Sequence, residues 1–242
     1  MDRLVYLSMS GAKATMHRQE VLAHNLANVS TNGFRAEMAA LRAVPVRGDG
    51  ASTRVFTLET TIGYDEASGM LQSTGRGLDV AMSGRAWLSI QALDGSEAYT
   101  RAGALEVNAE GTLVDVQGRP VLGDGGPITL PANARVEIAG DGSVSTTVGN
   151  GRPQNAGRLK LITPEGKLER GLDGLFRAPG GDPLPADATA RLKGGALEGS
   201  NVNAVETMVA MISASRQFEH QMKMLQNAER KEEQAAKLLG TV

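Results

Sequence analysis

Residues 25–34 read NLANVSTNGF and place three asparagines among apolar side chains at the end of an apparent helix. Asparagine has modest helix propensity and a strong turn preference, whereas a solvated loop has no need of Leu26, Val29 and Phe34. Gly33 predicts a left-handed helix stop, because glycine adopts a positive φ without a Cβ clash. The stretch therefore predicts a helix end that docks on an apolar surface.

Upstream of this stretch, residues 2–28 contain no proline and predict one helix with two apolar stripes. The first stripe repeats every seven residues and consists of Leu7, Ala14 and Val21. The second is wider and consists of Val5, Met9, Ala12, Met16, Ala23 and Leu26. Because two separate stripes need two sets of neighbours, this helix is expected to pack on more than one partner element.

The other end of the chain also predicts a helix, because no glycine or proline interrupts residues 202–239. A seam with alternating steps of three and four consists of Met208, Met211, Ser215, Phe218, Met222 and Leu225. Val205, Val209 and Ile212 widen that face. Such spacing is typical of coiled coils. About 37 helical residues would span roughly 55 Å, so the helix is expected to project from its own domain.

Between the two ends, the period of the apolar residues changes to that of short strands. The strand-like runs are WLSIQA (87–92), GTLVDV (111–116), RVEIA (135–139), SVSTTV (143–148) and RLKLIT (158–163). Turn signals such as Asp94-Gly95 and Asp141-Gly142 separate them, and no helical pattern intervenes. The middle of the chain is therefore expected to be a mainly antiparallel all-β domain.

The expected fold class is α+β, with the N- and C-terminal helices pairing in a coiled-coil-like arrangement beside the central β domain. The predicted segments are residues 1–35 for the first helix and its signature, 36–75 for an extended linker, 76–195 for the β domain, and 196–242 for the last helix. The linker assignment rests on polar composition, Pro45 and the run Gly48-Asp49-Gly50.

Composition disfavours several functional classes. The formal net charge is −2 and no Lys/Arg run exceeds a doublet, whereas nucleic-acid binders concentrate positive charge. Cysteine is absent, which excludes disulfides, thiolate catalysis and Cys-based zinc sites. No run approaches 18 apolar residues, so no membrane insertion is expected, and residues 4–16 lack the apolar core of a cleavable signal. These features alone would indicate a cytosolic protein.

No arrangement of residues predicts catalysis. The three histidines, His17, His24 and His220, lie in the helical ends without a metal-triad spacing, and the Ser-nucleophile, phosphate-loop and zinc-protease motifs are absent. Asp124-Gly125 lies in a run that predicts a turn, because the alternating carboxylates of a calcium loop are missing. Asp79 has no partner close in sequence. We therefore expect no enzyme, no cofactor and no metal.

The two ends together resemble a known family. The N-terminal residues Ala23, Asn25, Leu26, Ala27, Asn28, Thr31, Gly33 and Phe34 match the A-x-N-L-A-N-x-x-T-x-G-F signature of bacterial flagellar rod and hook proteins. The C-terminal signature is matched by Leu197-Glu198-Gly199-Ser200-Asn201-Val202-Asn203, which an apolar helix follows. The similarity covers nearly the whole chain.

Within this family the chain looks most like a proximal rod protein. The features that support this are the start MDRLVY, the runs LRAVPV (41–46) and GLDVA (77–81) before Trp87, and Tyr99-Thr100-Arg101. Ser215-Arg216-Gln217-Phe218-Glu219 departs from the Gln-Arg-aromatic-Glu element of distal rod and hook proteins, which are the alternative within the family. A secreted β-rich binding module with a helical oligomerisation stalk is an alternative of another class, although one Trp and three Tyr offer few exposed aromatics for a ligand.

The resemblance implies a structural subunit of the axial tube that transmits torque across the periplasm in the flagellum basal body. It also implies export through the flagellar type III apparatus without a cleaved signal peptide, and contacts with other axial proteins and with copies of itself. Buried asparagines are expected to fix the register between subunits, as single polar residues do in coiled coils. The expected interface residues are Leu7, Ala14, Val21, Asn25, Leu26, Asn28, Val29, Gly33, Phe34, Asn201, Val202, Val205, Met208, Val209, Met211, Ile212, Phe218, Met222 and Leu225.

Overall fold

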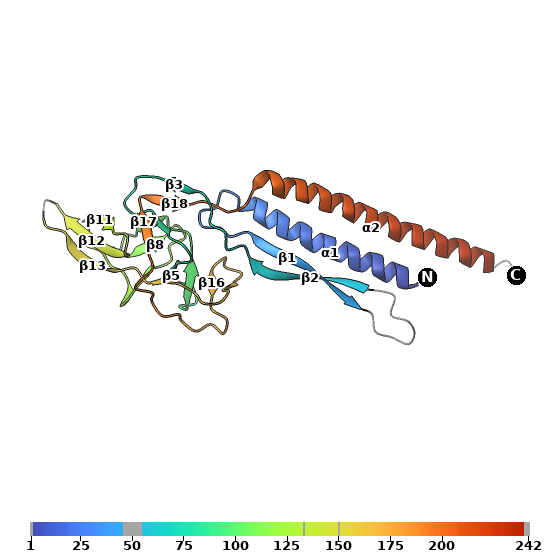
Figure 1. Cartoon of the computed structure of the whole chain (residues 1–242), viewed down its shortest axis with the longest axis horizontal. Coiled ribbons are helices and arrows are strands. Elements are labelled where there is room, and N and C mark those ends of the chain that lie inside the picture. Colours follow the sequence, from blue (N-terminus) through green and yellow to red (C-terminus); the bar gives the residue numbers. More distant parts are fainter. Residues whose placement is uncertain (1, 46–54, 133, 150, 240–242) are drawn as a thin grey trace. The chain divides into compact units, whose positions relative to one another are not determined.

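The computed structural model of the protein describes residues 2–45, 55–132, 134–149 and 151–239. They form two compact units (Figure 1). Unit 1 takes its described residues from 1–29, 37–64 and 202–242, and unit 2 consists of those in 30–36 and 65–201. The α+β class with terminal helices and antiparallel strands between them is confirmed. No helix in the described ranges is long and apolar enough to cross a membrane.

Unit 1 contains two helices and one hairpin. Helices α1 (Asp2–Ala27) and α2 (Ala204–Leu239) pack side by side in antiparallel directions (Figure 1). Strands β1 (Glu37–Pro45) and β2 (Val55–Tyr64) pair in antiparallel register, and both contact α1. Helix α1 therefore has the two sets of neighbours that its two stripes predict.

The hairpin corrects the expectation of an extended linker at 36–75. Its second strand, VFTLETTIGY, is rich in β-branched and aromatic residues, which favour a pleated, partly buried surface. Pro45 ends the first strand, a position where the lost N–H is tolerated. The run Gly48-Asp49-Gly50, which suggested a linker, lies outside the described residues.

The ends of both helices are set by asparagines. Helix α1 ends at Ala27, within one residue of the predicted range 2–28, and the Asn28 side chain donates to the carbonyl of His24 at 2.9 Å, which closes the last turn. Gly33 does have the predicted left-handed conformation, with φ of 70°, but it lies in a later turn. At the start of α2, Asn203 Oδ1 accepts from the backbone N–H of Val205 at 3.1 Å, the usual role of an N-cap residue.

Unit 2 is built from short antiparallel strands. Its main sheet has the order β14 (Leu161–Ile162), β5 (Trp87–Gln91), β6 (Glu97–Thr100), β16 (Phe176–Arg177) and β15 (Glu169–Arg170). A second sheet consists of β11 (Ala134–Ile138), β12 (Ser143–Val148) and β13 (Gln154–Arg158). The remaining pairs are β3 (Leu71–Ser73) with β18 (Ala196–Glu198), β4 (Val80–Met82) with β17 (Leu192–Gly194), β7 (Leu105–Val107) with β8 (Leu113–Asp115), and β9 (Leu122–Gly123) with β10 (Gly126–Pro127).

An aliphatic core holds these strands together. Its fully buried members are Val80, Leu88, Ile90, Ala98, Leu105, Leu113, Val121 and Val144. Burying one Val, Leu or Ile side chain is worth about 1.5–3 kcal/mol, so this cluster is the main source of stability in unit 2. Each of the five runs predicted as strands overlaps a strand of this unit.

Candidate assembly surface

Helices α1 and α2 meet along small side chains. A Cβ atom added to Gly11 of α1 would lie 3.0 Å from the amide group of Gln221, so the two elements approach closely there. On α2 the buried side chains are Thr207, Ala214 and Ala228. Small residues at such a seam let helix backbones approach, which larger side chains would prevent.

The buried face of α2 follows the predicted seam only in part. At Met208 and Met222 the packed residue is instead the one before it in the sequence. Met211, Phe218 and Leu225 are half-buried, as a seam requires. Met208 and Met222, however, are 48% and 37% exposed, because their neighbours Thr207 and Gln221 face the packed side instead. Methionine spacing alone could not reveal this shift, because apolarity favoured the larger side chain at each step.

On α1, the described residues of the first stripe are buried, whereas those of the second stripe are half-buried or exposed. Ala14 and Val21 are buried, whereas the side chain of Leu7 lies outside the described ones. In the second stripe, Met9 and Met16 are 62% and 53% exposed. At about 100° per residue they point some 140–160° away from Gly11, and hence away from α2.

The two asparagines of the opening stretch that the structure places in unit 1 have their partners within the same chain. Asn25 is buried; its Nδ2 donates to the carbonyl of Glu37 at 2.9 Å, and its Oδ1 accepts from the N–H of Glu37 at 2.8 Å. It thereby ties the end of α1 to the start of β1 as a neighbouring strand would. Asn28 closes the helix. These bonds give both amides a role within the chain, and their predicted contact between subunits stays a prediction. Leu26 and Val29 beside them are half-buried.

The rest of the N-terminal signature belongs to unit 2. Gly33 donates its N–H to the carbonyl of Glu198 at 2.7 Å, and a Cβ atom there would lie 2.2 Å from the carbonyl carbon of Arg101. Phe34 is buried, with the guanidinium of Arg170 stacked 4.4 Å from its ring centre. The residue at position 33 must therefore be glycine for reasons of space as well as of φ.

The C-terminal signature meets the N-terminal one through Asn201. Its N–H donates to the carbonyl of Phe34 at 3.3 Å, and its Oδ1 accepts from the N–H of Ala36 at 2.7 Å. Its Nδ2 donates to the carbonyls of Asp65 at 3.1 Å and Ala67 at 2.9 Å. One half-buried amide thus fastens three segments that are distant in sequence. Val202, the next residue, is half-buried as well.

A buried charge cluster lies beside this junction, and sequence reasoning did not find it. The carboxylate of Glu198 accepts from Arg35 Nη2 at 2.8 Å, from Arg101 Nε at 2.8 Å and from the N–H of Gly69 at 3.1 Å. The three charged side chains are each 1–2% exposed. One feature of the sequence could have indicated this cluster. Each signature carries a single charged residue among uncharged ones, Arg35 directly after Gly33-Phe34 and Glu198 inside the second signature. Asp79 also has partners nearby, Thr74 and Arg76.

Four of the exposed large apolar side chains described on α2 lie near its start. Val205, Met208, Val209 and Ile212 are 71%, 48%, 61% and 56% exposed. Their spacing of three, four and seven positions places them on one face of the helix. We call these four residues the α2 patch. A contiguous exposed apolar patch of this kind marks an interaction site in soluble proteins.

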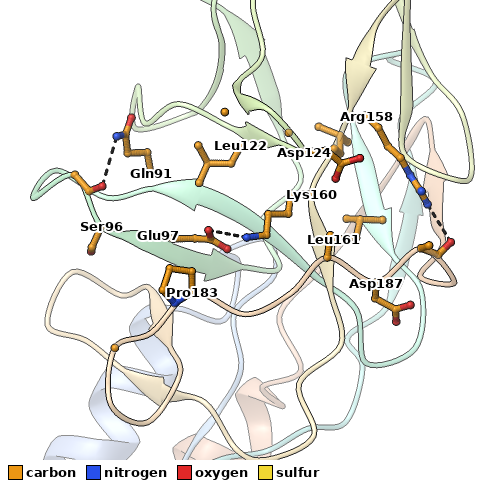
Figure 2. A pocket seen from close by; sticks show the side chains of 17 residues that line it. Gln91, Ser96, Glu97, Leu122, Asp124, Arg158, Lys160, Leu161, Pro183 and Asp187 are labelled. Atoms are coloured by element: carbon orange, nitrogen blue, oxygen red, sulfur yellow. Dashed lines mark hydrogen bonds and ion pairs between the residues drawn. The ribbon is translucent and has the colours of Figure 1, made fainter.

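Unit 2 also contains a cavity with charged side chains in its wall. Figure 2 shows a cavity of about 800 Å³ in which Lys160 pairs with Glu97 at 2.8 Å. Hydrogen bonds from Thr163 and Thr189 lower the pKa of Asp187 in its wall to about 2, so this carboxylate is a poor general base. Over the ranges that the structure describes, no three His, Asp or Glu side chains are grouped to hold a metal ion.

Comparison with known proteins matches both ends and the middle of the chain. Residues 6–35 match the family model for flagella basal body rod proteins, residues 81–146 the D1 domain of FlgE/F/G flagellar hook proteins, and residues 193–238 the C-terminal part of flagellar basal body rod FlgEFG proteins. The chain is 46% identical to the flagellar basal-body rod protein FlgF of Salmonella typhimurium and 45% identical to that of Escherichia coli, and both alignments cover 99% of each chain. It is 33% identical to the flagellar basal-body rod protein FlgG of Agrobacterium fabrum, over 94% of this chain and 95% of that one.

Proposed function

This chain belongs to the flagellar basal-body rod protein family, and we propose that it is built into the proximal rod through the exposed apolar faces of unit 1. It is a structural subunit rather than an enzyme, as its relatives are. The observation that carries this conclusion is identity of 46% along 99% of both chains, with the family signatures at both ends.

The finer proposal concerns the helices. The buried face of α2 follows steps of three and four through Thr207, Met211, Ala214 and Phe218. We take this spacing as support for a coiled-coil-like pairing of α1 with α2 inside each subunit. The α2 patch points away from that pairing, because at about 100° per residue its members lie on the opposite side of the helix. In the assembled rod, a neighbouring subunit would cover the α2 patch.

The remaining interface residues divide by their burial. Ala14, Val21, Asn25 and Phe34 are already covered within the chain, so they support the assembly by shaping each subunit. Other copies would cover two exposed surfaces. One is the α2 patch, and the other consists of Met9 and Met16 on α1. Contacts between different surfaces of identical chains propagate a helical array, which suits a rod.

Partners and location follow from family membership as proposals. The partners are neighbouring rod proteins, the distal rod protein and further copies of this chain. The subunit would reach the periplasmic part of the basal body through the flagellar type III export apparatus, without a cleaved signal peptide, and there transmit torque. A distal rod role is less favoured, because identity to the FlgG relative is 33% against 46% for the FlgF relative.

Ile212→Asp tests the α2 patch. The exposed side chain tolerates the change in the free monomer, where we expect stability within about 0.5 kcal/mol of the parent. In an assembled interface, the buried charge would cost several kcal/mol, so incorporation into basal bodies should be lost. Met224→Asp is the matched control, because Met224 is 51% exposed on another face of the same helix. Loss of incorporation by both variants, or by neither, would contradict the proposal.

A further inference from the structure

Two turns of unit 2 present the same tripeptide, Leu-Asp-Gly, at residues 93–95 and 172–174. The first joins β5 to β6 and the second joins β15 to β16. Leu93 and Leu172 are 94% and 112% exposed, more than any other large apolar side chain in the described ranges. Each turn is closed by a glycine with positive φ, so both leucines stand at the tips of tight turns.

The two turns lie side by side. Arg177 Nη2 is 2.7 Å from Asp173 Oδ2 and 3.7 Å from Asp94 Oδ2, so one guanidinium bridges both carboxylates. The hydrogen bond from Arg177 lowers the pKa of Asp173, and hydrogen bonds from Ser96 lower that of Asp94. Two fully exposed leucines therefore stand among two ionised acids and one cation. We call Leu93, Asp94, Leu172, Asp173 and Arg177 the leucine knob.

A single exposed leucine is ordinary, whereas Leu93 and Leu172 stand on two turns that share one ion-pair network. The knob carries a net charge of −1, from two carboxylates and one guanidinium. A surface that complements it must be apolar and carry a positive charge. The α2 patch is apolar, and Arg216, four positions after Ile212, places a cation next to it on the same helix face, with Glu219 one turn further along.

We propose that the leucine knob of one copy packs on the α2 patch of a second copy, with Asp94 facing Arg216. This inference rests on the proposed role of the α2 patch as an assembly surface, and it names what covers that surface. The side chains of both surfaces are exposed, and the proposed contact joins two chains. Because the two surfaces differ, the contact is heterologous and repeats from copy to copy, as a rod requires.

Disulfide trapping tests the contact directly, since the chain has no cysteine of its own. Leu172→Cys and Val209→Cys would be introduced on separate copies, co-expressed in cells without the native gene, and oxidised in isolated basal bodies. We expect a disulfide-linked dimer from this pair. Val148→Cys in place of Leu172→Cys, or Met224→Cys in place of Val209→Cys, should yield no dimer, although both positions are more than 50% exposed. No dimer from the test pair, or equal dimer from the controls, would overturn the proposal.

The paired variant Leu93→Ser with Leu172→Ser separates this inference from the function on which it rests. We expect reduced incorporation into basal bodies with an unchanged melting temperature, and no reduction for the control Val116→Ser, which is 54% exposed. If Ile212→Asp blocks assembly and the serine pair does not, the knob is wrong and the α2 patch stands. If the double serine variant blocks assembly but Leu172→Cys and Val209→Cys form no disulfide, another partner covers the knob and the inference is overturned. If Ile212→Asp is harmless, the proposed function itself fails.

Discussion

Glu198→Gln removes one charge and almost no volume from the junction of the two signature motifs. In the parent, the carboxylate compensates two guanidinium groups, Arg35 and Arg101, and all three side chains are at most 2% exposed. Glutamine keeps the shape but offers one oxygen, and its amide N–H groups point at other donors. The variant therefore leaves two buried positive charges without a counterion.

The expected loss can be bracketed from these contacts. Hydrogen bonds to charged groups are worth about 1.5–3 kcal/mol each, and Glu198 accepts them from Arg35 Nη2, Arg101 Nε and Gly69 N. Removing one partner of a buried ion pair costs about 3–5 kcal/mol after relaxation, and we expect this smaller range. A domain is stable by only about 5–15 kcal/mol, so unit 2 would lose much of its stability. At about 2–4 °C per kcal/mol, its melting temperature should fall by about 6–20 °C.

The chain contains its own probe for the measurement. Trp87 is its single tryptophan, is 4% exposed, and has the guanidinium carbon of Arg101 6.0 Å from its ring centre. Urea unfolding followed by tryptophan fluorescence therefore reports on unit 2. The matched control is Glu106→Gln, whose side chain is 59% exposed and 4.0 Å from Arg76. A surface pair of this kind contributes at most about 1 kcal/mol, so the control should unfold with the parent.

A small effect would refute the reasoning. If Glu198→Gln unfolds within about 1 kcal/mol of the parent with an unchanged denaturant slope, the two arginines do not depend on this carboxylate. Arg101→Met is the complementary variant, because it also removes the donors to the carbonyls of Met82, Gly84 and Ala86. We expect it to be at least as destabilising as Glu198→Gln, and the reverse order would show that the bonds to carbonyls contribute little.

Two further predictions concern unit 2. Gly33→Ala and Gly33→Asn should both destabilise it by more than about 2 kcal/mol in urea unfolding, because any Cβ atom collides with the backbone of Arg101; mild behaviour of Asn would mean that only φ matters. Burial raises the pKa of Tyr99 to about 12 from 10.0 in the unfolded chain, so its contribution to stability is complete below pH 10 and is lost as pH rises towards 12. Ultraviolet titration of the phenol should show this late ionisation, and Tyr99→Phe should flatten the alkaline loss of stability; a phenol that titrates near pH 10 in the folded protein would contradict both expectations.

Local patterns in the sequence were sufficient for the element types. The absence of glycine and proline at the C-terminal end predicted α2, and β-branched runs between turn residues predicted the strands of unit 2. The two stripes on α1 correctly indicated more than one neighbour, although Met9 and Met16 of the second stripe are exposed. The family signatures likewise stand in the sequence itself. Local patterns did not predict the structure of residues 36–64. Pro45 suggested a linker there, although β1 and β2 pair as antiparallel strands.

Only the tertiary structure decided which residues meet. Arg35, Arg101 and Glu198 are far apart in sequence, and charge type alone does not say which lysine, arginine or carboxylate is buried. The buried face of α2 includes Thr207 and Ala214, where apolarity alone favoured Met208, and this shift depends on how α1 packs against α2. Propensity and periodicity act over a few residues, so the sequence by itself determined the helices and strands. Pairings across 100 residues depend on packing the whole chain at once, which is why the junction and its buried charges could be read only from the folded protein.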